Sequence, residues 1–144
     1  TRVETPDGAA SFEMPKTGGS WEVNPNDGVP INNFECRFSF SQMSFTVMYT
    51  DLPSSVDVSD PNKIFEKYIG GKSEVIESTK KDVSMNGIPG ITYEEMSTYK
   101  GETFRDFNAV YLAGHRLYNI YYHANAKTYN EELANRFIGS LEIK

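Results

Sequence analysis

The segment NGIPGITYEEMSTYKGETFRDFNAVYLAGHRLYNIYYHANAKTYNEELANRFIGSLEI, residues 86–143, decides the fold of this chain. Its first two residues, Asn86-Gly87, favour a tight hairpin turn because both residue types accept a positive φ. Further turn signals follow at Lys100-Gly101-Glu102 and at Gly114-His115, between stretches rich in tyrosine and phenylalanine. Consecutive hairpins build an antiparallel meander. The predicted strands of this meander cover residues 90–99, 103–113 and 116–124.

Two helices are expected among the strands. Asp60 and Pro61 suit the N-cap and the first position of one helix, which Gly70-Gly71 would end. Thr128 and Glu131 have the spacing of a capping box for a second helix, which precedes a final strand at 140–143. Helices that occur singly between runs of strands are typical of an α+β domain rather than of a parallel βαβ protein.

The first part of the chain is less regular in its pattern. Residues 1–8 are polar and are expected to form a flexible leader before a short strand at 10–14. Residues 15–33 are rich in glycine, proline and asparagine and are predicted to be a long loop. Two alternating segments, 34–41 and 45–49, then predict a hairpin. Together these features predict one α+β domain over residues 1–144, with an antiparallel meander of six to seven strands packed by two or more helices.

The composition excludes several classes of protein. The chain carries 20 acidic and 14 basic residues, for a net charge of -6, and has no long basic run. Such a chain repels polyphosphate, so no nucleic acid is expected as a partner. No stretch is long and apolar enough to predict a transmembrane helix. The single cysteine, Cys36, rules out an internal disulfide, and its alternating apolar neighbours predict a core position.

The residues that most often carry catalysis are few. His115 and His123 lie at a predicted turn and near the end of a strand, and zinc sites need three or four converging ligands. No Gly-x-Ser-x-Gly elbow is present, and Glu94-Glu95 are neighbours on one strand and so point to opposite faces. No cofactor or metal is therefore expected, and the protein is predicted not to be an enzyme. A hydrolase that uses His115 or His123 is a distant alternative.

Several short motifs are similar to those of a known family. They are the Phe12–Pro15 strand, Phe45–Tyr49, the turn Gly87–Gly90, the segment Leu112–Tyr118, and Phe137–Leu141. In these motifs and in the order of its elements the chain resembles the PsbP-like family. The resemblance implies an α/β/α sandwich and a tendency to non-catalytic roles. That family includes extrinsic photosystem subunits, a Ran-binding nuclear-transport factor and bacterial envelope lipoproteins of unknown role. The long 15–33 segment departs from the family pattern.

The alternation of the last long strand indicates where binding could occur. Tyr118, Ile120 and Tyr122 share one face, whereas Tyr121 and His123 share the other. If one face forms the core, the other still presents rings with polar groups, which suits binding unless helices cover it or cross-strand pairing alone explains it. Trp21 either plugs the 15–33 loop onto the sheet or binds a partner. The candidate binding residues are Trp21, Arg105, Tyr111, His115 and Arg116.

These observations favour a non-enzymatic accessory protein of the bacterial cell envelope that acts through protein–protein contacts. The alternative is a small-ligand-binding module with a cleft between the sheet and the 15–33 loop. An extracytoplasmic location, in the periplasm or outer envelope, is expected, and a membrane would be reached only through a removed lipid anchor. The start at Thr1 rather than methionine fits removal of a signal peptide or trimming, and the sequence does not separate the two.

Overall fold

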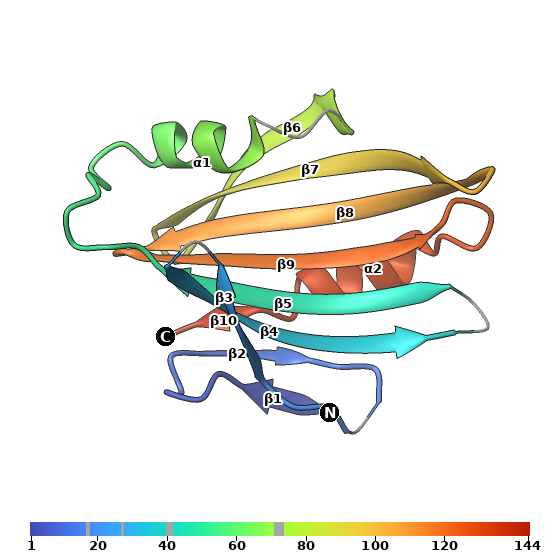
Figure 1. The fold of residues 1–144 in the computed structure, drawn as a ribbon, viewed down its shortest axis with the longest axis horizontal. Coiled ribbons are helices and arrows are strands. Elements are labelled where there is room, and N and C mark those ends of the chain that lie inside the picture. Colours follow the sequence, from blue (N-terminus) through green and yellow to red (C-terminus); the bar gives the residue numbers. More distant parts are fainter. Residues whose placement is uncertain (17, 27, 40–41, 71–73) are drawn as a thin grey trace.

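The chain folds as an α+β domain built on a seven-stranded antiparallel sheet in the order β3-β4-β5-β9-β8-β7-β6, with a second sheet in the order β1-β2-β10 (Figure 1). The computed structural model describes residues 1–16, 18–26, 28–39, 42–70 and 74–144. The strands are β1 Arg2–Glu4, β2 Ala10–Glu13, β3 Glu22–Asn26, β4 Val29–Phe38, β5 Met43–Asp51, β6 Val75–Met85, β7 Ile88–Tyr99, β8 Glu102–Ala113, β9 Arg116–Asn125 and β10 Glu142–Ile143. The helices are α1 Pro61–Ile69 and α2 Glu131–Ile138.

The predicted meander is confirmed, and its turns have the expected backbone. Strands β6, β7, β8 and β9 are neighbours in sequence order and pair antiparallel. Asn86 and Gly87 have φ values of 49° and 83°, and Lys100 and Gly101 have values of 50° and 79°. Two consecutive positive φ angles match the right-handed twist of the flanking strands. The α+β class with two helices is likewise confirmed.

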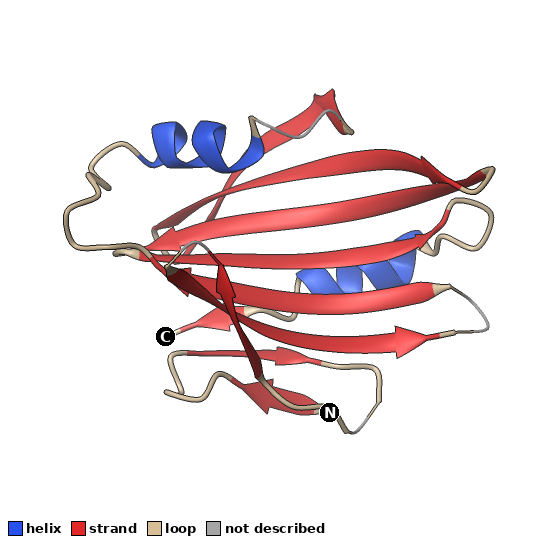
Figure 2. Cartoon of the chain, in the orientation of Figure 1, coloured by secondary structure: helices blue, strands red, loops and turns tan. Residues whose placement is uncertain are grey.

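The two helices lie against opposite faces of the large sheet (Figure 2). Helix α1 begins as predicted, because the Asp60 side chain accepts a hydrogen bond from the Asn62 backbone N–H (3.2 Å) and Pro61 is the first helical residue. Helix α2 is capped differently from the prediction. Asn130, rather than Thr128, is the N-cap, and its side chain accepts from the Leu133 N–H at 3.0 Å. Asparagine immediately before the helix is a better cap than a threonine two residues earlier.

The main core lies on the α2 side of the sheet. There Tyr118, Ile120 and Tyr122 of β9, all at most 1% exposed, pack with side chains from β2, β4, β5, α2 and β10. The Cys36 side chain is buried in this cluster, as its alternating neighbours predicted. A smaller core on the other face joins α1 to the sheet through Phe65, Ile69, Tyr93, Val110, Leu112 and Leu117.

Two predictions for the first part of the chain were wrong. Residues 1–8 are not a flexible leader, since β1 pairs with β2 and the Thr1 amine donates to the Met14 carbonyl (2.9 Å). Residues 15–33 are not one loop, since β3 and the start of β4 form a hairpin arm at the edge of the sheet. An edge strand tolerates proline, which otherwise argues against a strand. Residues 40, 41 and 71, which the sequence assigned to a hairpin and a helix end, lie outside the described residues.

The two described helices are both short. Neither is long and apolar enough to cross a membrane.

Candidate functional site

Trp21 belongs to the aromatic core rather than to a ligand cleft. Its ring lies 5.9 Å from Phe12, 5.5 Å from Phe34 and 5.4 Å from Tyr49, each pair edge to face. Its indole N–H donates to the Glu4 carbonyl at 2.9 Å. Residues 22–26 and 29–38, most of which the sequence assigned to the loop of the predicted cleft, are strands of the sheet.

The two predicted arginines hold parts of the fold together. Arg116 forms ion pairs with Asp51 at 2.7 Å and with Asp7 at 2.6 Å. Its guanidinium also stacks on the Tyr49 ring, which contacts Trp21. Its hydrogen bonds to Asp51 raise the pKa of Arg116. Arg105, at the other end of the sheet, bonds Glu94 at 2.5 Å and lies 4.0 Å from the centre of the Tyr129 ring.

The remaining two predicted residues also have structural contacts. Tyr111 is buried, and its ring lies over Gly90 on the neighbouring strand. His115 lies in the two-residue β8–β9 turn, where its Nε2 is 3.1 Å from the Val56 carbonyl oxygen. Trp21 and Arg116 thus share one neighbour, but the five predicted residues do not form a single site.

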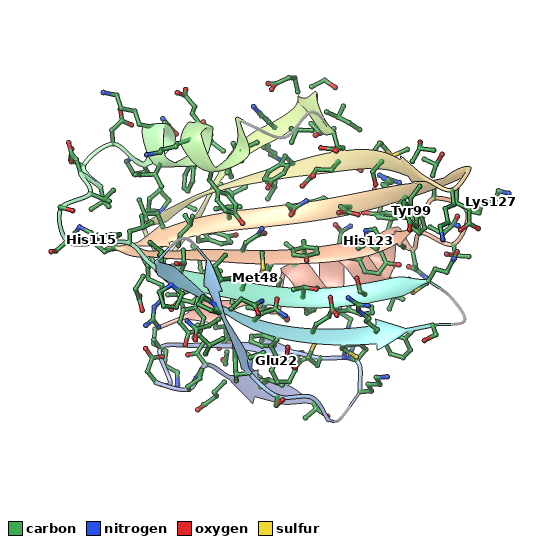
Figure 3. The ribbon with its side chains drawn as sticks, viewed as in Figure 1. Glu22, Met48, Tyr99, His115, His123 and Lys127 are labelled. Atoms are coloured by element: carbon green, nitrogen blue, oxygen red, sulfur yellow. The ribbon has the colours of Figure 1, made fainter. Side chains whose placement is uncertain are left out.

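A different surface carries a continuous set of polar side chains. Helix α1 covers only one end of its sheet face, and no described helix covers the rest (Figure 1). We call this uncovered part the open face. Figure 3 labels two of its residues, Met48 and His123. By strand register, the open face carries Glu35, Arg37, Ser44, Thr46, Met48, Asp106, Asn108, Tyr121 and His123.

The His123 side chain is held by a carboxylate and by an aromatic ring. Asp106 lies directly opposite on β8, and its carboxylate is hydrogen-bonded to His123 Nδ1. The Phe104 ring stacks on the imidazole, with 5.1 Å between centroids and 10° between planes. The hydrogen bond to Asp106 raises the pKa of His123, although burial and the nearby Arg37 oppose that shift. The imidazole therefore holds a proton more firmly than a free histidine.

The His123–Asp106 pair predicts a pH dependence of stability. Because the pKa of His123 is raised in the folded state, its stabilising contribution is full below the ordinary value of 6.5 and is lost as pH rises through the raised value. We expect the difference in free energy of unfolding between the wild type and His123→Gln to shrink from about pH 5 to about pH 8. Urea unfolding of both proteins at each pH measures it. A difference that stays constant or grows with pH contradicts the pairing.

A second group of polar side chains continues the open face. Glu35 is paired with Arg37, and the Thr46 hydroxyl donates to Glu35 at 3.5 Å. Burial raises the pKa of the Tyr121 phenol, which neighbours Thr46. Thr46 is fully buried although no described helix lies above it. Neighbouring side chains therefore cover the polar groups of this face.

The boundary between the open face and α1 is also polar. The Asn119 amide N–H donates to the Tyr68 hydroxyl at 2.9 Å and so ties α1 to β9. Asn108 donates to Glu95 at 3.1 Å. Among the described residues, the buried Tyr93 hydroxyl and Asn119 Oδ1 have no hydrogen-bond partner. Buried polar atoms are usually paired, so this boundary is less completely satisfied than an ordinary core.

A hollow of about 340 Å³ lies at one end of the open face. Gln42, on its rim, is fixed by accepting from the Asn125 amide (2.9 Å) and donating to Glu102 (3.2 Å). The hollow is lined by Arg37, Phe38, Ser39, Gln42, Met43, Ser44, Phe104 and His123.

The row Asp106, His123 and Ser44 lies across three adjacent strands, in an order that resembles the acid, base and nucleophile of a hydrolase. Acyl transfer needs a serine hydrogen-bonded to the histidine and N–H donors for the oxyanion. No hydrogen bond joins Ser44 to His123, and the backbone N–H groups of central strands are used by the sheet. Nor do the described His, Cys, Asp and Glu side chains form a group of three or more that could hold a metal ion. The arrangement is better suited to binding than to this chemistry.

Part of the open face could be predicted from the sequence. The alternation in β9 already placed Tyr121 and His123 on one face and Tyr118, Ile120 and Tyr122 on the other, without deciding which face is the core. Counting equally back and forward from the Gly114-His115 turn places Asp106 opposite His123, as observed. Arg37 and Ser44 were missed because β4 and β5 meet β9 across a long separation in sequence, which no local signal specifies.

The comparisons with known proteins support the fold only. No protein-family model and no curated protein matches the sequence. A crystal structure from Bacteroides thetaiotaomicron is similar, with a TM-score of 0.58 and 11% identity, covering 99% of this chain and 48% of that one. This chain thus spans about half the length of that protein. A protein of unknown function from Pseudomonas aeruginosa has a TM-score of 0.50 and 9% identity, covering 89% of this chain and 84% of that one.

Proposed function

We propose that the protein is a non-enzymatic accessory protein of the bacterial cell envelope that binds a protein partner through the open face. The observation that carries the proposal is a broad sheet surface that neither described helix covers and that presents half-buried rings beside ion pairs. Tyrosine, arginine and other side chains that combine apolar bodies with polar groups are enriched in protein interfaces.

The shape of this surface favours a protein over a small molecule. Small-molecule sites are concave and enclose most of their ligand. The open face instead extends over β4, β5, β9 and β8, and its hollow of about 340 Å³ lies at one end. A partner that lies along the strands would use the whole surface, whereas a small ligand would use only the hollow.

The envelope location and the PsbP-like relationship are parts of the same proposal. The motifs that carry the resemblance fall on structural positions: the Gly87–Gly90 turn begins β7, and Phe137–Leu141 ends α2 against the core. We infer a PsbP-like sandwich in which α1 and α2 are the outer layers. Fractionation of host cells with an antibody to the protein tests the location, and recovery in the cytoplasmic fraction would contradict it.

Affinity capture with matched charge variants tests the binding role. Arg37 is 75% exposed on the open face, and Arg136 is exposed on α2 at the opposite side of the sheet. We expect Arg37→Glu to reduce at least one protein captured from host envelope extract by about tenfold, because interface charge complementarity is reversed. Arg136→Glu should capture the same protein as the wild type does. Equal capture by all three proteins would refute the open face as the binding surface.

A further inference from the structure

We propose that the hollow beside His123 receives a carboxylate flanked by an apolar side chain, presented by the protein partner. This inference rests on the proposed function and names the chemistry that the partner brings to one end of the open face. The charge and the hydrogen-bond donors of the lining, and not only the shape of the hollow, select the group that binds there.

The charge of the lining is the first reason. Two basic residues, Arg37 and His123, line the hollow, and no acidic residue is among its lining residues. That lining contrasts with a chain whose net charge is -6. An anionic group enters such a hollow without facing a carboxylate across it, whereas a cation would meet two basic groups.

The free donors are the second reason. Asp106 is hydrogen-bonded to Nδ1 of His123. Nε2, on the opposite edge of the ring, has no hydrogen-bond partner among the described residues. Glu35 binds Arg37 through Nε, so the terminal guanidinium nitrogens extend beyond that pair. The hydroxyls of Ser39 and Ser44 add two more donors to the lining. Charge-assisted hydrogen bonds from such groups to a carboxylate are the strong ones.

The apolar part of the lining is the third reason, and it separates carboxylate from phosphate. Phe104 lines the same hollow with its ring stacked on the His123 imidazole, so a carboxylate with an adjoining apolar group contacts both kinds of wall. Glu35 and Asp106 already neutralise part of the charge on Arg37 and His123. The remaining positive potential suits one negative charge better than the two of a phosphate.

The test uses N-acetylphenylalanine, which has a free carboxylate, and N-acetylphenylalaninamide, which differs only in lacking the charge. Titration of the intact protein is followed by amide and imidazole NMR shifts. We expect the carboxylate to shift His123, Ser44 and Phe104 and to bind about tenfold more tightly than the amide, because hydrogen bonds to charged groups are lost with the charge. Inorganic phosphate should bind more weakly than the carboxylate.

Variants identify the groups responsible. His123→Gln and Arg37→Gln should each weaken binding of N-acetylphenylalanine by about tenfold. Arg136→Gln, with the same change of charge on the other side of the sheet, should leave it unchanged. Equal affinity for acid and amide, equal weakening by Arg136→Gln, or no shift at these residues would each overturn the proposal.

Failure of this proposal is distinguishable from failure of the proposed function. If Arg37→Glu loses the captured protein while N-acetylphenylalanine does not bind, the open face is an interface and the carboxylate subsite is refuted. If N-acetylphenylalanine binds as expected but does not displace the captured protein, the role of the hollow in partner binding is refuted. Displacement of the captured protein by the acid, and not by the amide, supports both.

Discussion

Replacing Tyr122 by alanine is expected to lower the free energy of unfolding by about 3–5 kcal/mol, the range for removal of a large buried ring. Tyr122 is fully buried, and its ring centre lies 5.1 Å from those of Phe45 and Tyr129. Its hydroxyl also accepts a hydrogen bond from the Asn130 backbone N–H at 3.2 Å, at the start of α2. The substitution therefore opens a cavity and leaves that N–H unpaired.

Tyr99 provides the matched control, since it is the same residue type but 65% exposed. Tyr99→Ala should change stability by less than about 0.5 kcal/mol, as surface substitutions usually do. Tyr122→Phe keeps the ring and should cost about 1 kcal/mol for the lost hydrogen bond. Urea unfolding measures all three variants. Similar losses for Tyr99→Ala and Tyr122→Ala would contradict the burial of Tyr122 in the main core.

Gly90→Ala is expected to destabilise the protein by about 1–3 kcal/mol through overpacking, although alanine suits a strand at least as well as glycine. A Cβ at Gly90 would lie 2.5 Å from Cδ1 of Tyr111 and 2.9 Å from the Val110 carbonyl oxygen. The glycine is therefore needed for the close approach of the Tyr111 ring. The sequence had placed it where the turn motif meets the predicted strand 90–99.

A double-mutant cycle separates this clash from other effects. In the Tyr111→Ala background the ring is absent, so Gly90→Ala should cost at least about 1 kcal/mol less than in the wild type. Gly90→Ala with no loss of stability, or equal losses in both backgrounds, would rule out the ring contact as the reason for glycine.

The sequence predicted those parts of the fold that local signals specify. The meander from β6 to β9 has two-residue turns with positive φ, and α1 has both its cap and its proline at the expected positions. The three-stranded sheet was not predicted, because β10 pairs with β2 from the other end of the chain. Strand β3 was missed because its proline content indicated a loop. Proline is tolerated in an edge strand such as β3.

The binding residues were harder to predict than the fold. Trp21, Tyr111 and Arg116 were chosen as conspicuous rings and charges, and the structure gives each of them a packing or ion-pair role. His123 was weighed as a metal ligand and as a catalytic base but not as a binding residue, because its relation to Arg37 and Ser44 depends on strands distant in sequence. A residue becomes a binding candidate through what surrounds it, and the pairing of distant strands supplies those surroundings.

The most direct test of the open face as the binding surface is photo-crosslinking from two positions of the intact protein. A benzophenone amino acid replaces Met48 on the open face or Asn135, which is exposed on α2 across the sheet. After irradiation in host envelope extract, we expect one discrete protein adduct from position 48 that is absent from position 135 and is lost in the Arg37→Glu background. The same adduct from both positions, or an adduct from position 135 alone, would contradict the account.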